Sequence, residues 1–161
     1  MRVLGIAISV VAATAGCSSL LTRYQAPSSG TPSAVLTVHN ATAGGVTLWP
    51  YSDAAHCKGL LQVAATFNMK PDARAEIVVQ AGEDVSVGSL QRWARWMCSA
   101  DATFRPESGR RYVADLLGNG SDCAIEIKRE EWRGDRVEIV PEPSFRPRKT
   151  VAPLVGSAYC E

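Results

Sequence analysis

In this chain of 161 residues, four cysteines are the residues whose type and spacing indicate their chemistry most clearly. They are Cys57, Cys98, Cys123 and Cys160, separated by 25 to 41 residues. Metal sites use closely spaced ligands such as Cys-x-x-Cys or nearby histidines, so this spacing disfavours a metal centre. An even number of cysteines instead predicts two disulfides, provided that the chain is exported to an oxidising compartment.

Three pairings of these cysteines are possible. We favour Cys57 with Cys98 and Cys123 with Cys160, because near neighbours in sequence pair most often. Each bridge would close a loop of about 40 residues and stabilise the fold by about 3–4 kcal/mol.

Residues suited to catalysis form no recognisable constellation. His39 and His56 are too far apart in sequence to form a ligand pair, and the carboxylate pairs Glu83-Asp84 and Glu130-Glu131 fall near predicted turns. The sequence contains no nucleophile elbow, phosphate-binding loop or dinucleotide fingerprint. We therefore expect a protein that is not an enzyme and that uses no dissociable cofactor.

The first sixteen residues have the pattern of a secretory signal peptide. Met1-Arg2 supplies a positive start, and Val3 to Ala13 is an unbroken run of apolar and small residues. That run is about half of the roughly 20 residues that a membrane-spanning helix needs. A positive start, a short apolar run and a small-residue end predict export and removal of residues 1–16.

Thr14-Ala15-Gly16-Cys17 resembles the lipobox of bacterial lipoproteins, with Thr14 where that family prefers Leu. The resemblance implies cleavage before Cys17 and covalent attachment of diacylglycerol and acyl chains, palmitate among them, to that residue. Two or more chains hold a protein stably on a membrane. Ser18 resembles the outer-membrane sorting class, which implies an outer-membrane protein facing the periplasm. The alternative is an ordinary signal peptide followed by an incidental cysteine.

Charge argues against a nucleic-acid partner. The chain has 17 basic and 16 acidic residues, and loss of residues 1–16 removes one basic residue, Arg2. The mature chain is then neutral overall and has no basic stripe of the kind that nucleic acids require.

The remaining sequence predicts a linker followed by one all-β domain. Residues 18–34 are rich in Ser, Pro, Gly and Thr, so residues 17–34 are expected to form a lipidated flexible linker. Residues 35–161 show short alternating runs separated by turn signals, which favour an antiparallel β-sandwich, immunoglobulin- or transthyretin-like. Gln91–Ala100 is the one candidate for a short helix, and Arg92–Cys98 within it is also a candidate strand. Prolines after residue 140 disfavour regular ladders there, and a bridge at Cys160 would strap the C-terminal segment across the domain.

Two sequence units resemble small β-sandwich lipoproteins of Gram-negative bacteria. The first is a strand, an Ala-Gly turn and a second strand over residues 77–87, and the second is Phe-x-Pro-x-x-Gly-x-x-Tyr from Phe104 to Tyr112. Members of that group with known roles are mostly assembly, binding or envelope components, so the resemblance implies a comparable role here.

The stretch from Arg92 to Met97 interleaves two tryptophans with two arginines. Trp93, Arg95 and Trp96 are the candidate binding residues, because Trp and Arg are enriched at interaction hot spots and stack on sugars. The alternative is that the indoles pack in the core. The leading hypothesis is a membrane-anchored protein that binds another envelope protein, and the second is a peptidoglycan- or glycan-binding module.

Overall fold

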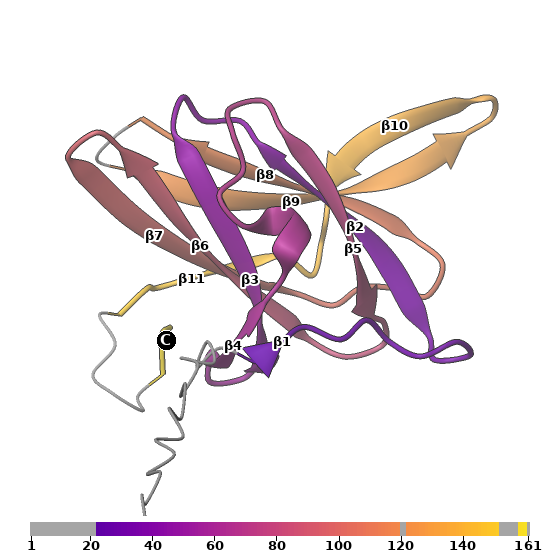
Figure 1. The fold of residues 1–161 in the computed structure, drawn as a ribbon. Helices are drawn as coiled ribbons and strands as arrows, with labels where there is room; N and C mark the ends of the chain where they lie inside the picture. The colour runs from indigo at the N-terminus through magenta and orange to yellow at the C-terminus, as the bar shows by residue number, and fades with distance from the viewer. Residues whose placement is uncertain (1–21, 120–121, 152–157, 161) are drawn as a thin grey trace, which may run out of the picture.

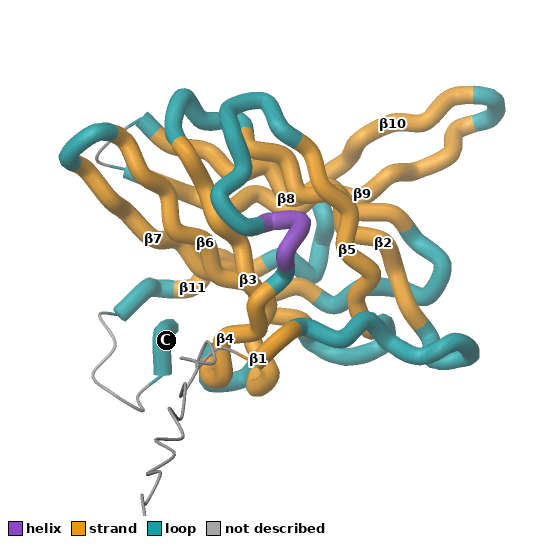
Figure 2. Tube along the Cα trace, in the orientation of Figure 1, coloured by secondary structure: helices purple, strands orange, loops and turns teal. Residues whose placement is uncertain are grey.

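The computed structural model describes residues 22–119, 122–151 and 158–160, and nearly all of its regular structure is β (Figure 2). One 3-10 turn, η1, interrupts the strands at Ala64–Thr66. The strands are β1 Thr22–Arg23, β2 Ser33–Asn40, β3 Gly45–Asp53, β4 Lys58–Gln62, β5 Arg74–Gln80, β6 Val85–Trp93, β7 Trp96–Phe104, β8 Arg111–Gly118, β9 Cys123–Arg133, β10 Arg136–Pro141 and β11 Arg146–Arg148.

Two sheets pack face to face (Figure 1), which confirms the predicted all-β sandwich. One sheet has the order β1-β4-β3-β6-β7-β11, and the other has the order β10-β9-β8-β2-β5. Most neighbours are antiparallel, as expected, but β1 pairs with β4 and β2 pairs with β8 in parallel. Both sheets are therefore mixed. Parallel pairs join strands that are distant in sequence, so alternation along one strand could not reveal them.

The core lies between the sheets and follows from period-2 alternation. In β2 every second residue, including Leu36 and Val38, is fully buried, and the residues between them are only partly buried. Phe104 and Tyr112, the ends of the Phe-to-Tyr unit, pack edge to face with ring centroids 5.2 Å apart. The Tyr112 hydroxyl also accepts a hydrogen bond from the Glu107 N–H, so the end of the unit is hydrogen-bonded to its turn.

Gln91–Ala100, the candidate for a short helix, forms strand instead, as the alternative strand at Arg92–Cys98 predicted. This segment is a hairpin in which Trp93 of β6 lies opposite Trp96 of β7, and the two-residue loop has Ala94 at φ 41°. Gln91 is buried and Arg92 is exposed, which is the alternation of a strand rather than of a helix.

The disulfide pairing favoured from sequence is also wrong, although all four cysteines form bridges. Cys57 pairs with Cys160 across 103 residues, and Cys98 pairs with Cys123 across 25 residues. The packing of the sheets determines both pairings, because β7 packs against β9 and the C-terminal residues lie beside the loop after β3. The second bridge therefore joins the two sheets.

Part of the predicted linker, residues 17–34, contacts the folded domain where the structure describes it. Thr22 and Arg23 pair with β4, and the Tyr24 N–H donates to the Gln62 carbonyl. The Tyr24 hydroxyl donates to the Val78 carbonyl at 2.7 Å. The chain is thus held against both sheets from Thr22 onward. Cys17 and the predicted signal peptide, residues 1–16, lie outside the described residues.

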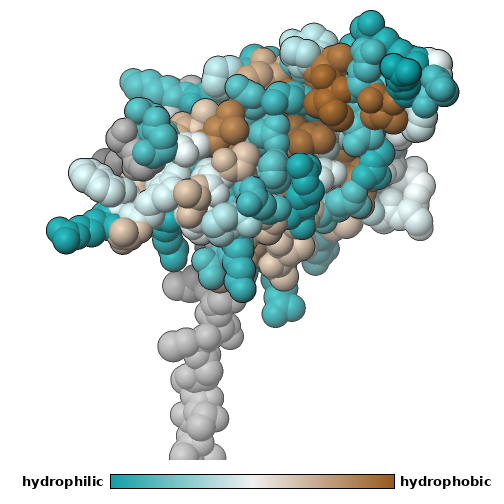
Figure 3. Space-filling model, turned by 90° about the horizontal axis from the view of Figure 1, so that it is seen from above, coloured by the Kyte–Doolittle hydropathy of each residue, from teal (hydrophilic) through white to brown (hydrophobic). Residues whose placement is uncertain are grey.

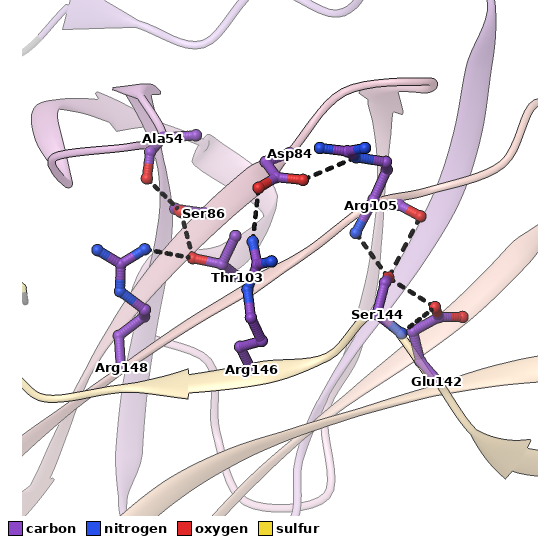
Figure 4. Close-up of polar contacts among 9 residues, drawn as sticks. All are labelled: Ala54, Asp84, Ser86, Thr103, Arg105, Glu142, Ser144, Arg146 and Arg148. Atoms are coloured by element: carbon purple, nitrogen blue, oxygen red, sulfur yellow. Dashed lines mark hydrogen bonds and ion pairs between the residues drawn. The ribbon is translucent and has the colours of Figure 1, made fainter.

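Residues 142–151, here called the strap, follow β10 and pair through β11 with β7 (Figure 1), and Figure 4 shows some of their polar contacts. Arg146 and Arg105 donate to the two oxygens of Asp84, at 2.5 and 2.8 Å. The Ser144 hydroxyl accepts from the Arg105 N–H at 2.8 Å and donates to Glu142 at 2.6 Å. The strap is fixed by polar contacts in addition to its strand pairing.

Candidate binding surfaces

The β6–β7 hairpin carries the three candidate binding residues and gives them different environments. Trp93 packs over two glycines, because a Cβ on Gly44 would lie 2.9 Å from its ring and a Cβ on Gly118 would lie 2.6 Å from it. Trp93 therefore packs against the fold, which agrees with the alternative that the indoles are structural. Trp96, on the other strand of the hairpin, remains 66% exposed, and Arg95 is exposed in the turn.

Met97 extends this exposed end and was not identified from sequence. It is 70% exposed and lies directly opposite Arg92 on the outer face of the six-stranded sheet. Neither Arg92 nor Arg95 has an ion-pair partner among the residues that the structure describes. We call Arg92, Arg95, Trp96 and Met97 the tip surface. It combines two large apolar groups with two uncompensated positive charges around the end of the hairpin, where Trp96 shares the face of Trp93 and Met97 shares the face of Arg92.

The base of the hairpin is rigidly held. The Cys98–Cys123 disulfide ties β7 to β9, and the Gln91 side chain donates to the Leu117 carbonyl at 2.9 Å. Both contacts connect the hairpin to the opposite sheet. The tip surface is consequently preorganised, which reduces the entropy lost when a partner binds.

An apolar hollow of about 150 Å³ adjoins the tip surface on the same face of the sheet. Arg92 lines one side of it, and Phe67, which is 55% exposed, lines another. Trp49 and Leu90 also contribute to its walls. This hollow could receive one apolar side chain of a partner whose main contacts are with the tip surface.

A second exposed apolar group lies on the β9–β10 hairpin, which projects from the sandwich as a ribbon (Figure 1). Trp132, Val137 and Ile139 are 71%, 42% and 50% exposed. Figure 3, which looks onto the molecule from above, shows apolar residues ringed by hydrophilic ones toward the end where this ribbon projects. Alternation of apolar and polar residues over 137–140 is typical of a strand with one buried face, but the ribbon extends past the core and leaves that face in solvent.

Asp101 is the most buried of the acidic residues on the outer face of the six-stranded sheet, and it anchors the strap. It accepts hydrogen bonds from the Tyr51 hydroxyl at 2.7 Å and from the Thr150 hydroxyl at 2.5 Å. Burial raises the pKa of Asp101, against the lowering effect of these two donors. Burial also raises the pKa of Tyr51, and the hydrogen bond to Asp101 adds to that effect. These hydrogen bonds hold the strap against the sheet.

The histidines and carboxylate pairs considered for catalysis are engaged in pairwise contacts. His39 contacts Asp115 at 2.8 Å, and His56 contacts Asp53 at 2.9 Å. Asp84 belongs to the strap network, and Glu130 lies 3.5 Å from Arg111. Among the described residues no group of three or more His, Cys, Asp or Glu side chains is arranged to hold a metal ion.

No protein-family model matches this chain, and no curated protein is significantly similar to it. Within the described part of the chain, no helix has both the length and the apolar character needed to cross a bilayer.

Proposed function

We propose that this chain is an exported lipoprotein, anchored through acyl chains on Cys17, that binds an acidic protein partner in the cell envelope through its tip surface. The observation that carries the binding role is the exposure of Met97 directly opposite Arg92, next to the turn that carries Arg95 and the exposed Trp96; neither arginine has an ion-pair partner among the described residues. The role requires no catalysis and no dissociable cofactor. The anchor would lie in the outer membrane, with the domain in the periplasm.

The chemistry of the tip surface favours a protein partner with exposed carboxylates. Trp and Arg are the residue types that most often dominate binding energy at protein interfaces. The thioether of Met97 adapts to irregular apolar surfaces. Acidic groups on the partner would form the ion pairs that Arg92 and Arg95 lack, and would steer association by long-range attraction.

The short distance between the anchor and the domain supports the same role. Only four residues, 18–21, separate Cys17 from Thr22 of β1. Fully extended, the five Cα-to-Cα steps from Cys17 to Thr22 span at most about 17–18 Å. An anchor on Cys17 would hold the β1–β4 end of the sandwich near the bilayer. The turn of the β6–β7 hairpin lies at the other end (Figure 1), where it would face away from the membrane.

The test of the binding role is site-specific photocrosslinking in intact cells. A crosslinkable residue in place of Met97 should capture an envelope protein, and Arg92→Glu combined with Arg95→Glu should abolish that capture. The matched control places the crosslinker at Ser108, an exposed loop residue outside the tip surface. Equal capture from Met97 and Ser108, or capture unaffected by charge reversal, would refute binding through the tip surface.

The anchor is tested separately. The native chain should incorporate labelled palmitate and fractionate with outer membranes, and Cys17→Ala should lose both properties. A Cys17→Ala protein that still incorporates palmitate would exclude Cys17 as the site of lipidation.

Exposure of the Trp96 indole next to a guanidinium also favours a second candidate function, binding of peptidoglycan or another glycan. An indole can stack on a sugar ring, and Arg95 could pair with carboxylates of the polymer. Trp93 would not contribute, because its ring packs on Gly44 and Gly118. The purified protein should then sediment with cell-wall sacculi, and Trp96→Ala should prevent this while Trp132→Ala does not. Absence of sedimentation by the native chain would exclude this candidate.

A further inference from the structure

The β9–β10 ribbon is an incomplete sheet. Pairing of β9 with β8 runs from Cys123 to Arg129, and beyond this point β9 pairs only with β10. β10 is the last strand of its sheet, so among the described residues no other strand pairs with its outer edge. Two-stranded ribbons are only marginally stable in water, and free strand edges readily accept another strand.

The two faces of the ribbon differ in character. Val137 lies opposite Trp132 on the mainly apolar face, and Ile139 lies on the same face opposite Glu130. The other face is charged, and it places Arg136 directly opposite Arg133 and Glu138 opposite Glu131. Like charges that face each other across a strand pair are unfavourable.

Diagonal ion pairs offset part of this repulsion, but none of them includes Arg136. Arg133 lies 3.1 Å from Glu138 and 3.8 Å from Glu131. Glu131 also pairs with Arg129. Arg136 has no acidic partner among the described residues, although it projects from the free edge strand.

We propose that the outer edge of β10 pairs antiparallel with β10 of a second copy of this chain, about a two-fold axis at Val137. In this register Val137 lies opposite Val137 of the other copy, and Arg136 lies opposite its Glu138. Both copies then gain the acidic partner that Arg136 lacks. The apolar side chains form one stripe across four strands, from Trp132 of one copy to Trp132 of the other.

Neighbouring registers are less favourable. Moving the two-fold axis to Glu138 places two carboxylates opposite each other. Moving it to Ile139 places Glu138 opposite Val140, and Arg136 loses its counterpart within β10. A two-fold interface uses the same patch on both copies, so a self-complementary strand is what such an interface requires. This interface is separate from the tip surface and does not depend on the proposed anchor.

The test uses two full-length copies with different affinity tags, co-expressed and extracted in mild detergent. Native copies should co-purify. Arg136→Glu in both copies, or Glu138→Arg in both copies, should reduce co-purification by at least about tenfold, because each change creates two like-charge contacts across the axis. One copy with Arg136→Glu and one with Glu138→Arg should co-purify again, since both contacts are then between opposite charges.

Recovery in the mixed pair cannot arise from better folding of either copy, because each chain is unchanged from the one that fails alone. Arg74→Glu in both copies is the matched control. It reverses another exposed arginine without an ion-pair partner among the described residues, on β5 at the other edge of the same sheet, and it should leave co-purification intact. Native copies that do not co-purify, or a mixed pair no stronger than the single changes, would overturn the proposal.

Discussion

The strap and the tip surface use the same kinds of side chain in opposite ways. In the strap, Arg146 is paired with a carboxylate, and the adjoining Asp101 accepts two hydrogen bonds. In the tip surface, Arg92 and Arg95 have no such partner among the described residues, and Trp96 is largely exposed. The two regions also differ in position, because the strap runs along the body of the sheet whereas the tip surface lies at the end of the β6–β7 hairpin.

This contrast separates groups that hold the fold together from groups available to a partner. Polar groups that are buried and fully hydrogen-bonded add cohesion, and removing one partner leaves the other unsatisfied. Exposed groups contribute little to stability and can be changed at small cost. Substitutions in the strap should therefore change the free energy of unfolding, whereas substitutions in the tip surface should change binding.

The largest effect should come from the disulfide between Cys57 and Cys160. Replacing both residues with Ala should lower the free energy of unfolding by about 4–5 kcal/mol, because this bridge closes a loop of roughly 100 residues. The matched loss of Cys98–Cys123 should cost less, about 3–4 kcal/mol, because its loop is shorter. Denaturant unfolding of the oxidised proteins measures both, and the reverse order would contradict the loop argument.

A smaller effect should follow from Asp101→Ala. The change leaves the buried Tyr51 hydroxyl without its acceptor and should cost about 1–3 kcal/mol. It should also loosen the strap, which limited proteolysis between residues 142 and 151 would detect. Glu126→Ala is the control, because Glu126 is an exposed acid on the other sheet. Equal stability of the two variants would refute the role of Asp101 as an anchor.

The two tryptophans of the β6–β7 hairpin should differ in a matched pair of substitutions. Trp93→Ala should lower the free energy of unfolding by roughly 2 kcal/mol, since it opens a cavity over Gly44 and Gly118. Trp96→Ala should change stability by no more than about 0.5 kcal/mol. Thermal unfolding gives both values, and a Trp96→Ala variant as unstable as Trp93→Ala would mean that Trp96 packs against the fold.

The smallest effect should be a pH dependence carried by Asp84. Burial would raise the pKa of Asp84, but hydrogen bonds from Arg146 and Arg105 outweigh it and lower the pKa below its usual value. As the pH falls through about 4, the Asp84 carboxyl takes up a proton more readily in the unfolded chain than in the folded chain. The part of the free energy of unfolding that comes from its ion pairs is therefore present above that pH and is lost below it. Asp84→Asn should flatten this acid-side loss in unfolding curves recorded at several pH values.

Asp101 should act with the opposite sign. Its pKa is raised in the folded chain, so stability falls as the pH rises from the unfolded pKa through the folded one. Asp101→Asn should remove that fall. An acid-side slope unchanged by Asp84→Asn would show that the ion pairs of the strap add nothing to stability.

Local sequence alone determined the fold class and the use of the cysteines. Alternation of apolar and polar residues, as in Cys123 to Lys128, specifies strands because successive side chains point to opposite faces of a sheet. An even number of widely spaced cysteines predicted bridges, and all four form them. These features depend on composition and on periods of a few residues, which a single sequence displays directly.

Tertiary structure decided which partners meet. The bridges join Cys57 to Cys160 and Cys98 to Cys123 because the sheets bring these strands and loops together, and sequence distance carries no record of that. Trp93 is packed and Trp96 exposed because only Trp93 faces glycines on other strands. Val137 and Ile139 alternate like core residues but lie in solvent, since burial depends on whether an opposing sheet reaches that far, and the ribbon extends beyond it.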